Sequence, residues 1–436
     1  MPLTAPCTPA GPVRQRGVAH VAFTGLLMLA LVMGLGFANR QLLTEQRATT
    51  NQLRAAQATA AAEAGLDWAV ARLNDPQAID DDCRPTEALA ADTFRSRYLR
   101  VDPVTETITP ATRVDGPDAV PLDAACVRIE QGWRCRCSAA DTPPLAPTDS
   151  AELEPAFVVQ VEAAGAPGLL RVVSRGCAHR GAACGGPNGA AADGAAEAHV
   201  LLGWLPALRT PPVAALTTRG GVESNGALQL VGAGSDGLAV HAGGSVRAPH
   251  ARWLSSAGAP LDQAVVQDDA LLADRPAGRT FVAHFGLDPE AWAAQPAVRP
   301  LACGDDCTAA LRDAVAADAA PTLVRIAGDA RLRGPATFGT AERPVAIVVT
   351  GALAIEGAVS IVGVVHADSV VWNATEASPT LPAGSPAASL RGALLSASDY
   401  RGDGAPSIRH DPEVLDRLRR HAGTFARVAG SWRDFR

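Results

Sequence analysis

The stretch that decides the fold is VAHVAFTGLLMLALVMGLGFA, which runs from Val18 to Ala38. His20 is its only ionisable residue. As a helix, this segment would span roughly 32 Å, about the thickness of the hydrocarbon core of a bilayer. Arg14 and Arg16 precede it without a nearby acid, so the positive-inside rule places the first residues in the cytoplasm. The sequence therefore predicts a single membrane pass through residues 18–38, with the bulk of the chain outside the cytoplasmic membrane.

The sequence after this segment predicts that the helix continues. From Arg40 it is rich in Ala, Gln, Arg, Leu and Glu, and it contains no proline until Asn74-Asp75-Pro76, which is a stop signal. Leu66, Val70 and Leu73 fall at i, i+4 and i+7 and form one stripe. We therefore expect one helix of roughly 84 Å, apolar in its first half and amphipathic in its second, within residues 18–75.

Composition limits the remaining possibilities. The chain has 436 residues with a formal net charge of −7, which argues against a general nucleic-acid binder. All 38 basic residues are arginine, so a Walker lysine, a Schiff-base lysine and a lysine general base are excluded. Aromatic residues are only 4%, while Gly (41) and Pro (33) are numerous. This mixture favours a loop-rich β architecture outside the helix.

Two motifs carry a resemblance to a known family. Arg14-Gln15-Arg16-Gly17 before the apolar helix, followed by QAT-AAAEAGLDWAVARL, resembles the N-terminal region of PilX-type minor pilins of type IV pili, over residues 15–73. Residues 411–415 (DPEVL) and 430–435 (GSWRDF) are similar to the ending of large proteins of that family. The middle of the chain is not covered by the resemblance.

The resemblance implies how the chain would be processed and where it would go. Residues 1–17 would be a basic leader, cut after Gly17 by the prepilin peptidase, and Val18 would become the N-methylated first residue. The subunit would wait in the inner membrane and then enter the pilus at the cell surface. Its implied partners are other minor pilins, the major pilin and a tip adhesin. Filament packing would use Ala22, Leu26, Leu29 and Met33.

Ala22 departs from the pilin pattern, in which this position is a glutamate. In a filament that carboxylate pairs with the N-terminal amine of the neighbouring subunit toward the tip. A subunit at the tip has no such neighbour, and an unpaired buried carboxylate would cost several kcal/mol. Ala22 therefore fits a tip-proximal or priming subunit. It also resembles the K-type pseudopilin of type II secretion, which lacks the same glutamate.

Other interpretations of the apolar segment remain open. A cleaved secretory signal could end at Gly36-Phe37-Ala38, although its apolar core would be unusually long. A plain signal anchor would also fit the hydropathy. His20 is expected to be a neutral residue at the membrane interface or in helix packing.

The cysteines point to an oxidising compartment. Cleavage after Gly17 would remove Cys7 and leave an even number, which we interpret as up to four disulfides. Cys135 and Cys137 share one face of a predicted strand, so they are expected to reach Cys83 and Cys126 and not each other. A zinc site is disfavoured because no CxxC pair occurs. The disulfide candidates are Cys83, Cys126, Cys135, Cys137, Cys177, Cys184, Cys303 and Cys307.

Residues 76–210 are expected to form a disulfide-rich, pilin-like antiparallel β region. Alternating apolar sequence predicts strands at 156–163, 168–176 and 197–205, separated by turns. Residues 77–150 look irregular. A long helix packed on an antiparallel sheet is the pilin architecture that the resemblance implies.

Residues 211–400 change to short β runs with Gly at the corners, which is typical of stacked solenoid rungs. We expect a β-solenoid-like domain, with a compact β-sandwich as the alternative. An insertion at about 251–320 would contain a helix at 308–318. Residues 401–436 would hold a last helix near 413–421 and the SWRDF tail. The fold class is thus α+β, mostly β outside the membrane.

A search for catalytic groups finds only scattered residues. β-Helix enzymes place several carboxylates on one face, so carboxylates should recur at a fixed spacing in the sequence. No pair of candidates does so, and we expect the candidates to be solvated turn residues. Arg401-Gly402-Asp403 spells a cell-adhesion tripeptide, but composition alone gives a chance occurrence of roughly 25%, so no role is assigned to it. Neither a metal nor another cofactor is expected. The candidates are Asp329, Glu356, His366, Asp368, Asp399 and Asp403, together with Ser407 near His410 and Asp411.

The preferred hypothesis is therefore a non-enzymatic, PilX-like minor pilin that primes assembly or sits at the tip. The alternatives are a type II secretion pseudopilin, whose outer domain would be helical and metal-binding, and a membrane-anchored β-helix protein that binds or cleaves polysaccharide.

Overall fold

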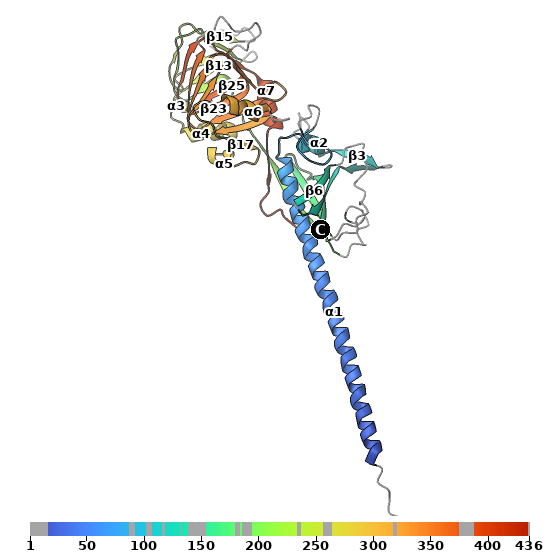
Figure 1. Cartoon of the computed structure of the whole chain (residues 1–436). Coiled ribbons are helices and arrows are strands. Elements are labelled where there is room, and N and C mark those ends of the chain that lie inside the picture. Colours follow the sequence, from blue (N-terminus) through green and yellow to red (C-terminus); the bar gives the residue numbers. More distant parts are fainter. Residues whose placement is uncertain are drawn as a thin grey trace, which may run out of the picture.

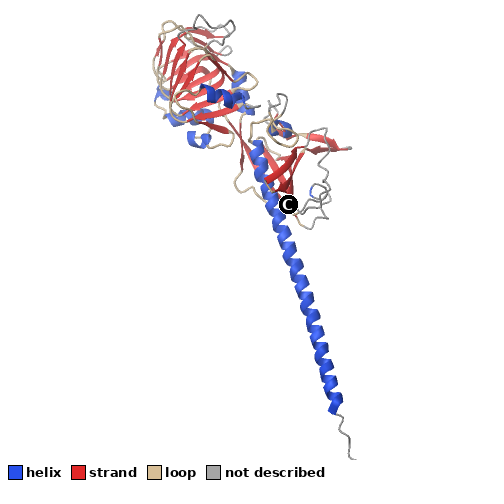
Figure 2. Cartoon of the chain, viewed as in Figure 1, coloured by secondary structure: helices blue, strands red, loops and turns tan. Residues whose placement is uncertain are grey.

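The computed structural model describes residues 16–86, 92–101, 107–115, 118–130, 132–137, 154–178, 184, 194–232, 237–255, 264–316, 321–374 and 388–434. These residues form a long N-terminal helix, an antiparallel sheet on the end of that helix, and a larger β unit beyond the sheet (Figures 1 and 2). The chain is thus an α+β protein that is mostly β outside its long helix, as expected.

Helix α1 (Arg16–Leu73) has 58 residues and is about 87 Å long. Every side chain from His20 to Leu53 is exposed, and this half of the helix stands clear of the other described residues (Figure 1). The helix ends immediately before Asn74-Asp75-Pro76, as the sequence predicts. Asn74 also fixes this end, because its Nδ2 donates to the Phe425 carbonyl (3.0 Å) and its Oδ1 accepts from the Phe425 amide (2.8 Å).

The second half of α1 packs on a six-stranded antiparallel sheet of order β28-β9-β8-β7-β5-β6. The expected three-stranded meander corresponds to β7 to β9. β5 and β6 add two further strands to the sheet. They come from residues 77–150, where frequent arginines interrupt the alternation of apolar and polar residues that would predict strands. The strands are β5 (Asp123–Ile129), β6 (Gly132–Cys137), β7 (Ala156–Ala163), β8 (Leu169–Cys177), β9 (Ala195–Pro206) and β28 (Gly423–Arg427).

Small elements precede this sheet: helix α2 (Phe94–Tyr98) and two short antiparallel pairs. The pairs are β1 (Leu99–Val101) with β2 (Ile108–Pro110), and β3 (Thr112–Asp115) with β4 (Asp118–Pro121).

Small residues bring α1 and the sheet into backbone contact. Leu66 and Leu73 of the expected stripe are buried, but Val70 is only half-buried, because the contact runs along smaller residues instead. At Gly176 of β8, a Cβ would lie 2.1 Å from the Ala58 carbonyl oxygen. The buried face of the helix consists of Ala58, Ala61, Ala62, Gly65, Leu66, Ala69 and Leu73.

This contact predicts a position-specific effect of one methyl group. Gly176→Ala must push α1 off β8, so we expect the free energy of unfolding to fall by about 2 kcal/mol. Gly203→Ala on β9 is the matched control, because its Cβ would meet Leu169 Cδ2 at an ordinary 3.6 Å. Its effect should stay within about 0.5 kcal/mol. Urea unfolding of the full chain in detergent measures both, and equal losses would contradict the prediction.

The β unit consists of parallel strands in a 12-stranded and a six-stranded sheet. The larger sheet bends within β23 and β25, so the strands form three rows. The bend falls at Gly363 (φ 152°) and Gly392 (φ 138°), which are paired in register. A Cβ at Gly392 would lie 1.8 Å from the Gly363 carbonyl oxygen, so only glycine fits this corner.

The rows are as follows, each in its spatial order. The first row is β17 (Val298–Leu301), β18 (Thr322–Ile326), β21 (Val345–Val349), the second halves of β23 (Val359–Ala367) and β25 (Ser389–Ser396), β10 (Ala214–Thr218), β13 (Leu238–Ala242) and β16 (Val265–Val266). The second row is β19 (Ala330–Arg333), β22 (Ala352–Glu356), β24 (Ser369–Ala374), β26 (Tyr400–Gly404), β11 (Val222–Ser224) and β14 (Val246–Arg247). The third row is β20 (Ala336–Phe338), the first halves of β23 and β25, β27 (Ser407–His410), β12 (Gln229–Gly232) and β15 (Arg252–Ser255).

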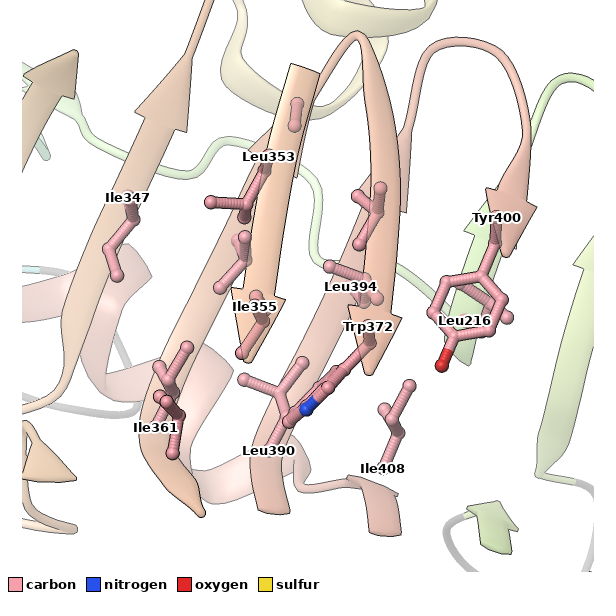
Figure 3. Packing of buried hydrophobic residues seen from close by; sticks show 14 of the residues in the cluster. Leu216, Ile347, Leu353, Ile355, Ile361, Trp372, Leu390, Leu394, Tyr400 and Ile408 are labelled. Atoms are coloured by element: carbon pink, nitrogen blue, oxygen red, sulfur yellow. The ribbon is translucent and has the colours of Figure 1, made fainter. Parts of the chain in front are cut away.

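The three rows enclose one hydrophobic core. Figure 3 shows Ile347, Leu353 and Ile361, one from each row, with their side chains turned into the shared interior. Trp372 and Tyr400 are fully buried in this interior. Burial raises the pKa of Tyr400, so its hydroxyl stays protonated. The apolar faces of the short Gly-bounded runs therefore serve a single core.

The chain enters this stack in its middle. β10 lies between β25 and β13, and the chain then runs outward to β16 at one end. It crosses to β17 at the other end and returns strand by strand to β27 beside β12. The crossing contains α3 (Ala270–Ala273), α4 (Ala277–Phe285) and α5 (Pro289–Ala293). The helix expected at 308–318 follows β17 as α6 (Thr308–Ala316).

The β unit is inserted between two neighbouring strands of the antiparallel sheet. β9 ends at Pro206, and after the unit the chain returns through α7 (Pro412–His421) to β28, which pairs with β9. The expected boundary at residue 400 cuts through β26, so 401–436 is no separate tail. Its last part lies along β9, where Arg433 and His199 exchange two backbone hydrogen bonds of 2.9 and 3.0 Å.

Candidate functional surfaces

The first part of the free half of α1, up to Ala38, is an apolar surface on every side, and residues 39–53 beyond it are exposed and mostly polar. Leu26, Leu29 and Met33 are 67%, 52% and 65% exposed, and Ala22 is exposed on the same face. This is the one helix among the described residues that is long and apolar enough to cross a membrane. An exposed helix that is apolar all round belongs in a bilayer or against other helices. The chain thus has an N-terminal anchor-like helix.

The processing residues lie at the start of this helix. Gly17 and Val18 fall in the first turn of α1, while residues 1–15 of the expected leader, Cys7 included, lie outside the described residues. His20 is exposed, and its carbonyl accepts a hydrogen bond from the Thr24 hydroxyl (2.8 Å).

The eight cysteines beyond Cys7 form four disulfides. Cys135 and Cys137 bond to Cys126 and Cys83, as their shared strand face suggested, and not to each other. Cys83–Cys137 ties the segment after α1 to β6, and Cys126–Cys135 joins β5 to β6. The remaining pairs are Cys177–Cys184 after β8 and Cys303–Cys307 before α6.

The carboxylates weighed as catalytic candidates hold corners or ion pairs. Asp329 accepts from the Ala352 amide and Asp399 from the Gly221 amide, each at 2.8 Å, so both brace turns between rows. Glu356 lies on the outer face of β22, 3.2 Å from Arg331. Among the described residues, no group of three His, Cys, Asp or Glu side chains gathers into a metal-binding arrangement.

His366 and Asp368 do not share a face, although positions i and i+2 of a continuous strand would do so. His366 is 6% exposed beneath α4, whereas Asp368 lies exposed at the next corner. Partial burial, with Asp329 nearby, raises the pKa of Asp368. A strand that ends at Ala367 explains the difference, because alternation stops where the strand turns.

Ser407, His410 and Asp411 do not form a catalytic set. His410 Nε2 lies 2.7 Å from the Pro212 carbonyl. Asp411 caps α7 by accepting from the amides of Glu413 (3.0 Å) and Val414, and it pairs with Arg391. Burial opposes the charge of Asp411, but its bonds from Arg391 and these amides hold its pKa below the usual value.

The Arg401-Gly402-Asp403 tripeptide lies within strand β26. Arg401 is 3.9 Å from Glu223 on β11, and Asp403 accepts from the Gly404 amide. The tripeptide is therefore extended within the second row, where Arg401 and Gly402 pair with both β11 and β24 and Asp403 pairs with β24.

Arg95 of α2 lies where the two units meet. Its guanidinium donates to the carbonyl oxygens of Leu73 (2.8 and 2.9 Å) and His421 (3.3 Å), the last residues of α1 and α7. The C-terminal ends of both helices carry partial negative charge, which favours a cation there. Burial lowers the pKa of Arg95 to about 10, so it remains charged at neutral pH. Sequence analysis missed this residue, since its partners are backbone atoms far away in the chain.

Comparison with known proteins adds little. No protein-family model and no curated protein matches the chain. One solved structure, that of the competence-associated pilin ComZ from Thermus thermophilus, is 12% identical and aligns over 87% of this chain and 97% of its own, with a TM-score of 0.19. At that score the likeness shows neither a shared fold nor a shared function.

Proposed function

We propose that this chain is a non-enzymatic minor subunit of a type IV pilus. The observation that carries the proposal is the form of α1: its free apolar part (up to Ala38) continues without a break, through an exposed polar stretch at 39–53, into a part packed on an antiparallel sheet. An anchor alone needs no such rigid continuation. A filament subunit does, because its helix must hold the outer domain at a fixed height above the helical core of the filament.

The path into the filament follows from the same helix. Ala22, Leu26, Leu29 and Met33 would pack first in the bilayer and then against helices of other minor pilins and the major pilin. Prepilin peptidase would act after Gly17. Because Ala22 replaces the usual glutamate, we place the subunit at or near the tip, where an adhesin would be a neighbour.

The β unit would be the part presented outward. We infer that its three rows of parallel strands are the three faces of a β-solenoid, since each turn of the chain from β10 to β15 and from β18 to β27 contributes one strand to each row. It is attached by two chain connections, β9 and β28, at the end of the sheet away from the free helix (Figure 1). Asp329 and Asp399 accept backbone hydrogen bonds that brace turns in this unit, which supports a binding or structural role for it.

Mass spectrometry of the N-terminus tests the proposal directly. Membrane and sheared-surface fractions should both contain a chain that starts at methylated Val18. A start at Met1 or Asn39 would contradict the proposal. Recovery of the processed chain with a secretion complex, and not with sheared filaments, would assign it to type II secretion.

A charge in the free helix tests the packing step. Leu29→Arg makes the free energy of membrane insertion less favourable by about 3 kcal/mol, because the charge lies near the centre of the apolar helix. The variant should therefore be missing from the sheared filament fraction. Gln57→Arg places the same charge on an exposed position of the same helix, beyond the apolar stretch, and should leave incorporation unchanged. Immunoblots of both fractions measure the effect. Undiminished incorporation of Leu29→Arg would overturn the proposed packing.

A further inference from the structure

A cleft of about 750 Å³ lies at the junction of the antiparallel sheet and the β unit, between α2 and α7. In Figure 1, α7 lies on the side of the β unit nearest α2. Residues of α2, β1 and β9 line one wall, and α7 lines another. This volume is in the range of sites that enclose a small ligand or a few units of a polymer.

The cleft concentrates positive charge in a chain whose net charge is negative. Glu342 is the one carboxylate among the residues that line it. Of the arginines, Arg419 and Arg420 share Asp416, at 3.5 and 2.7 Å. The arginines that line the cleft are Arg95, Arg100, Arg209, Arg417, Arg419 and Arg420.

Three of these cations are available to a ligand. Arg100, Arg209 and Arg417 are exposed, and none makes a side-chain hydrogen bond or ion pair with any other residue that the structure describes. They come from both sides of the junction: Arg100 from β1, and Arg209 and Arg417 from the β unit. A bound anion would therefore contact both units at once.

The walls also offer some aromatic and proline surface. Trp204 and Pro206 line the cleft and are half-buried, whereas Phe425 and Leu99 are only 1% and 4% exposed. The Trp204 ring packs against the Phe425 ring, with centroids 4.9 Å apart, and the Arg95 guanidinium lies 4.9 Å from the Trp204 centroid. A small inorganic anion would leave this surface unused.

We propose that this cleft binds an acidic oligosaccharide, a short run of sugar units that carry carboxylates. Carboxylates fit the fork of a guanidinium, and the apolar faces of sugar rings fit aromatic and proline side chains. Single-stranded nucleic acid is recognised along a basic groove several nucleotides long, whereas these arginines converge on one cavity. The proposal does not depend on filament assembly, so its test is independent of the proposed function.

Calorimetric titration of the full chain in detergent micelles, at low salt, tests the ligand class. The probe is trigalacturonate, and its fully methyl-esterified form is the control with the same rings and no charge. We expect saturable binding of the acid with a Kd below about 1 mM, and at least about tenfold weaker binding of the ester. Absence of binding at that concentration, or equal binding of the ester, would overturn the proposal.

Two variants test the place of binding. Arg209→Gln and Arg417→Gln should each weaken binding of the acid about fivefold to tenfold, and thermal unfolding should be unchanged because neither side chain holds the fold. Arg247→Gln, on exposed β14 outside the cleft, should leave the affinity unchanged. An equal loss in Arg247→Gln would indicate nonspecific charge attraction and refute the site. Tighter binding of a single-stranded hexanucleotide than of the sugar would refute the ligand class.

Discussion

Replacing residues 207–422 with an Asn-Gly turn is expected to leave a folded antiparallel unit on α1. Pro206 and Gly423 lie directly opposite each other at the ends of β9 and β28, and two-residue Asn-Gly turns join such antiparallel strands. The pairing of β28, the Asn74–Phe425 hydrogen bonds and three of the four disulfides all lie outside the excised segment. The remaining unit should therefore unfold in one cooperative transition.

The matched control removes five more residues. Replacing 207–427 also deletes β28, which leaves β9 as an unpaired edge and Asn74 without its partner. This variant should aggregate or lose its cooperative transition. Circular dichroism, a free-thiol assay and thermal unfolding of both variants in detergent measure the difference. An unfolded 207–422 replacement, with free thiols, would show that the β unit is needed for the fold of the sheet.

The sequence predicts those elements whose signals come from neighbouring residues in the chain. The apolar run at 18–38 and the stop at Asn74-Asp75-Pro76 define α1, because both signals depend only on neighbours in the chain. The contact face of that helix was harder to predict. A search for large apolar residues finds Leu66 and Leu73, but the close approach at Gly176 depends on Ala58 and Ala62, which carry little hydropathy signal.

The insertion could not be predicted because it depends on one distant pairing. β28 has five residues and joins β9, from which the whole β unit separates it in sequence. Local pattern can suggest a strand there but cannot name its partner. The pairing also explains why the chain enters the stack of strands at β10, in its middle. The first and last residues of the β unit must lie close together, because they connect to the paired strands β9 and β28.

The cleft was missed for the same reason. Arg95, Arg209 and Arg417 lie far apart in the sequence, and only the return of α7 to β28 brings them together. The run RLRRH at 417–421 was the available local signal. This run predicts part of a last helix, and the pattern alone gives its charge no role.

His366→Leu is expected to make the protein markedly less sensitive to acid. His366 is buried, neither ring nitrogen has a hydrogen-bond partner among the described residues, and its ring packs edge-on against Phe281 (4.9 Å) and Phe285 (5.8 Å) of α4. Burial, with His284 nearby, lowers its pKa from 6.5 to about 4. Between these values the unfolded chain binds a proton that the folded chain does not. Stability therefore falls as pH drops from about 6.5 to 4, by roughly 3 kcal/mol in total.

Urea unfolding of the full chain at pH 7.5 and pH 4.5 measures the loss of stability that His366 causes on acidification. At pH 7.5, His366→Leu should be within about 1 kcal/mol of the unsubstituted protein, because losing an unpaired buried imidazole offsets the lost aromatic contacts. At pH 4.5 it should be the more stable by about 2 kcal/mol, since leucine takes up no proton on unfolding. His250→Leu, at an exposed position, should follow the unsubstituted protein at both values. Parallel acid losses in the His366→Leu variant and the unsubstituted protein would mean that the other histidines and the carboxylates carry the pH dependence.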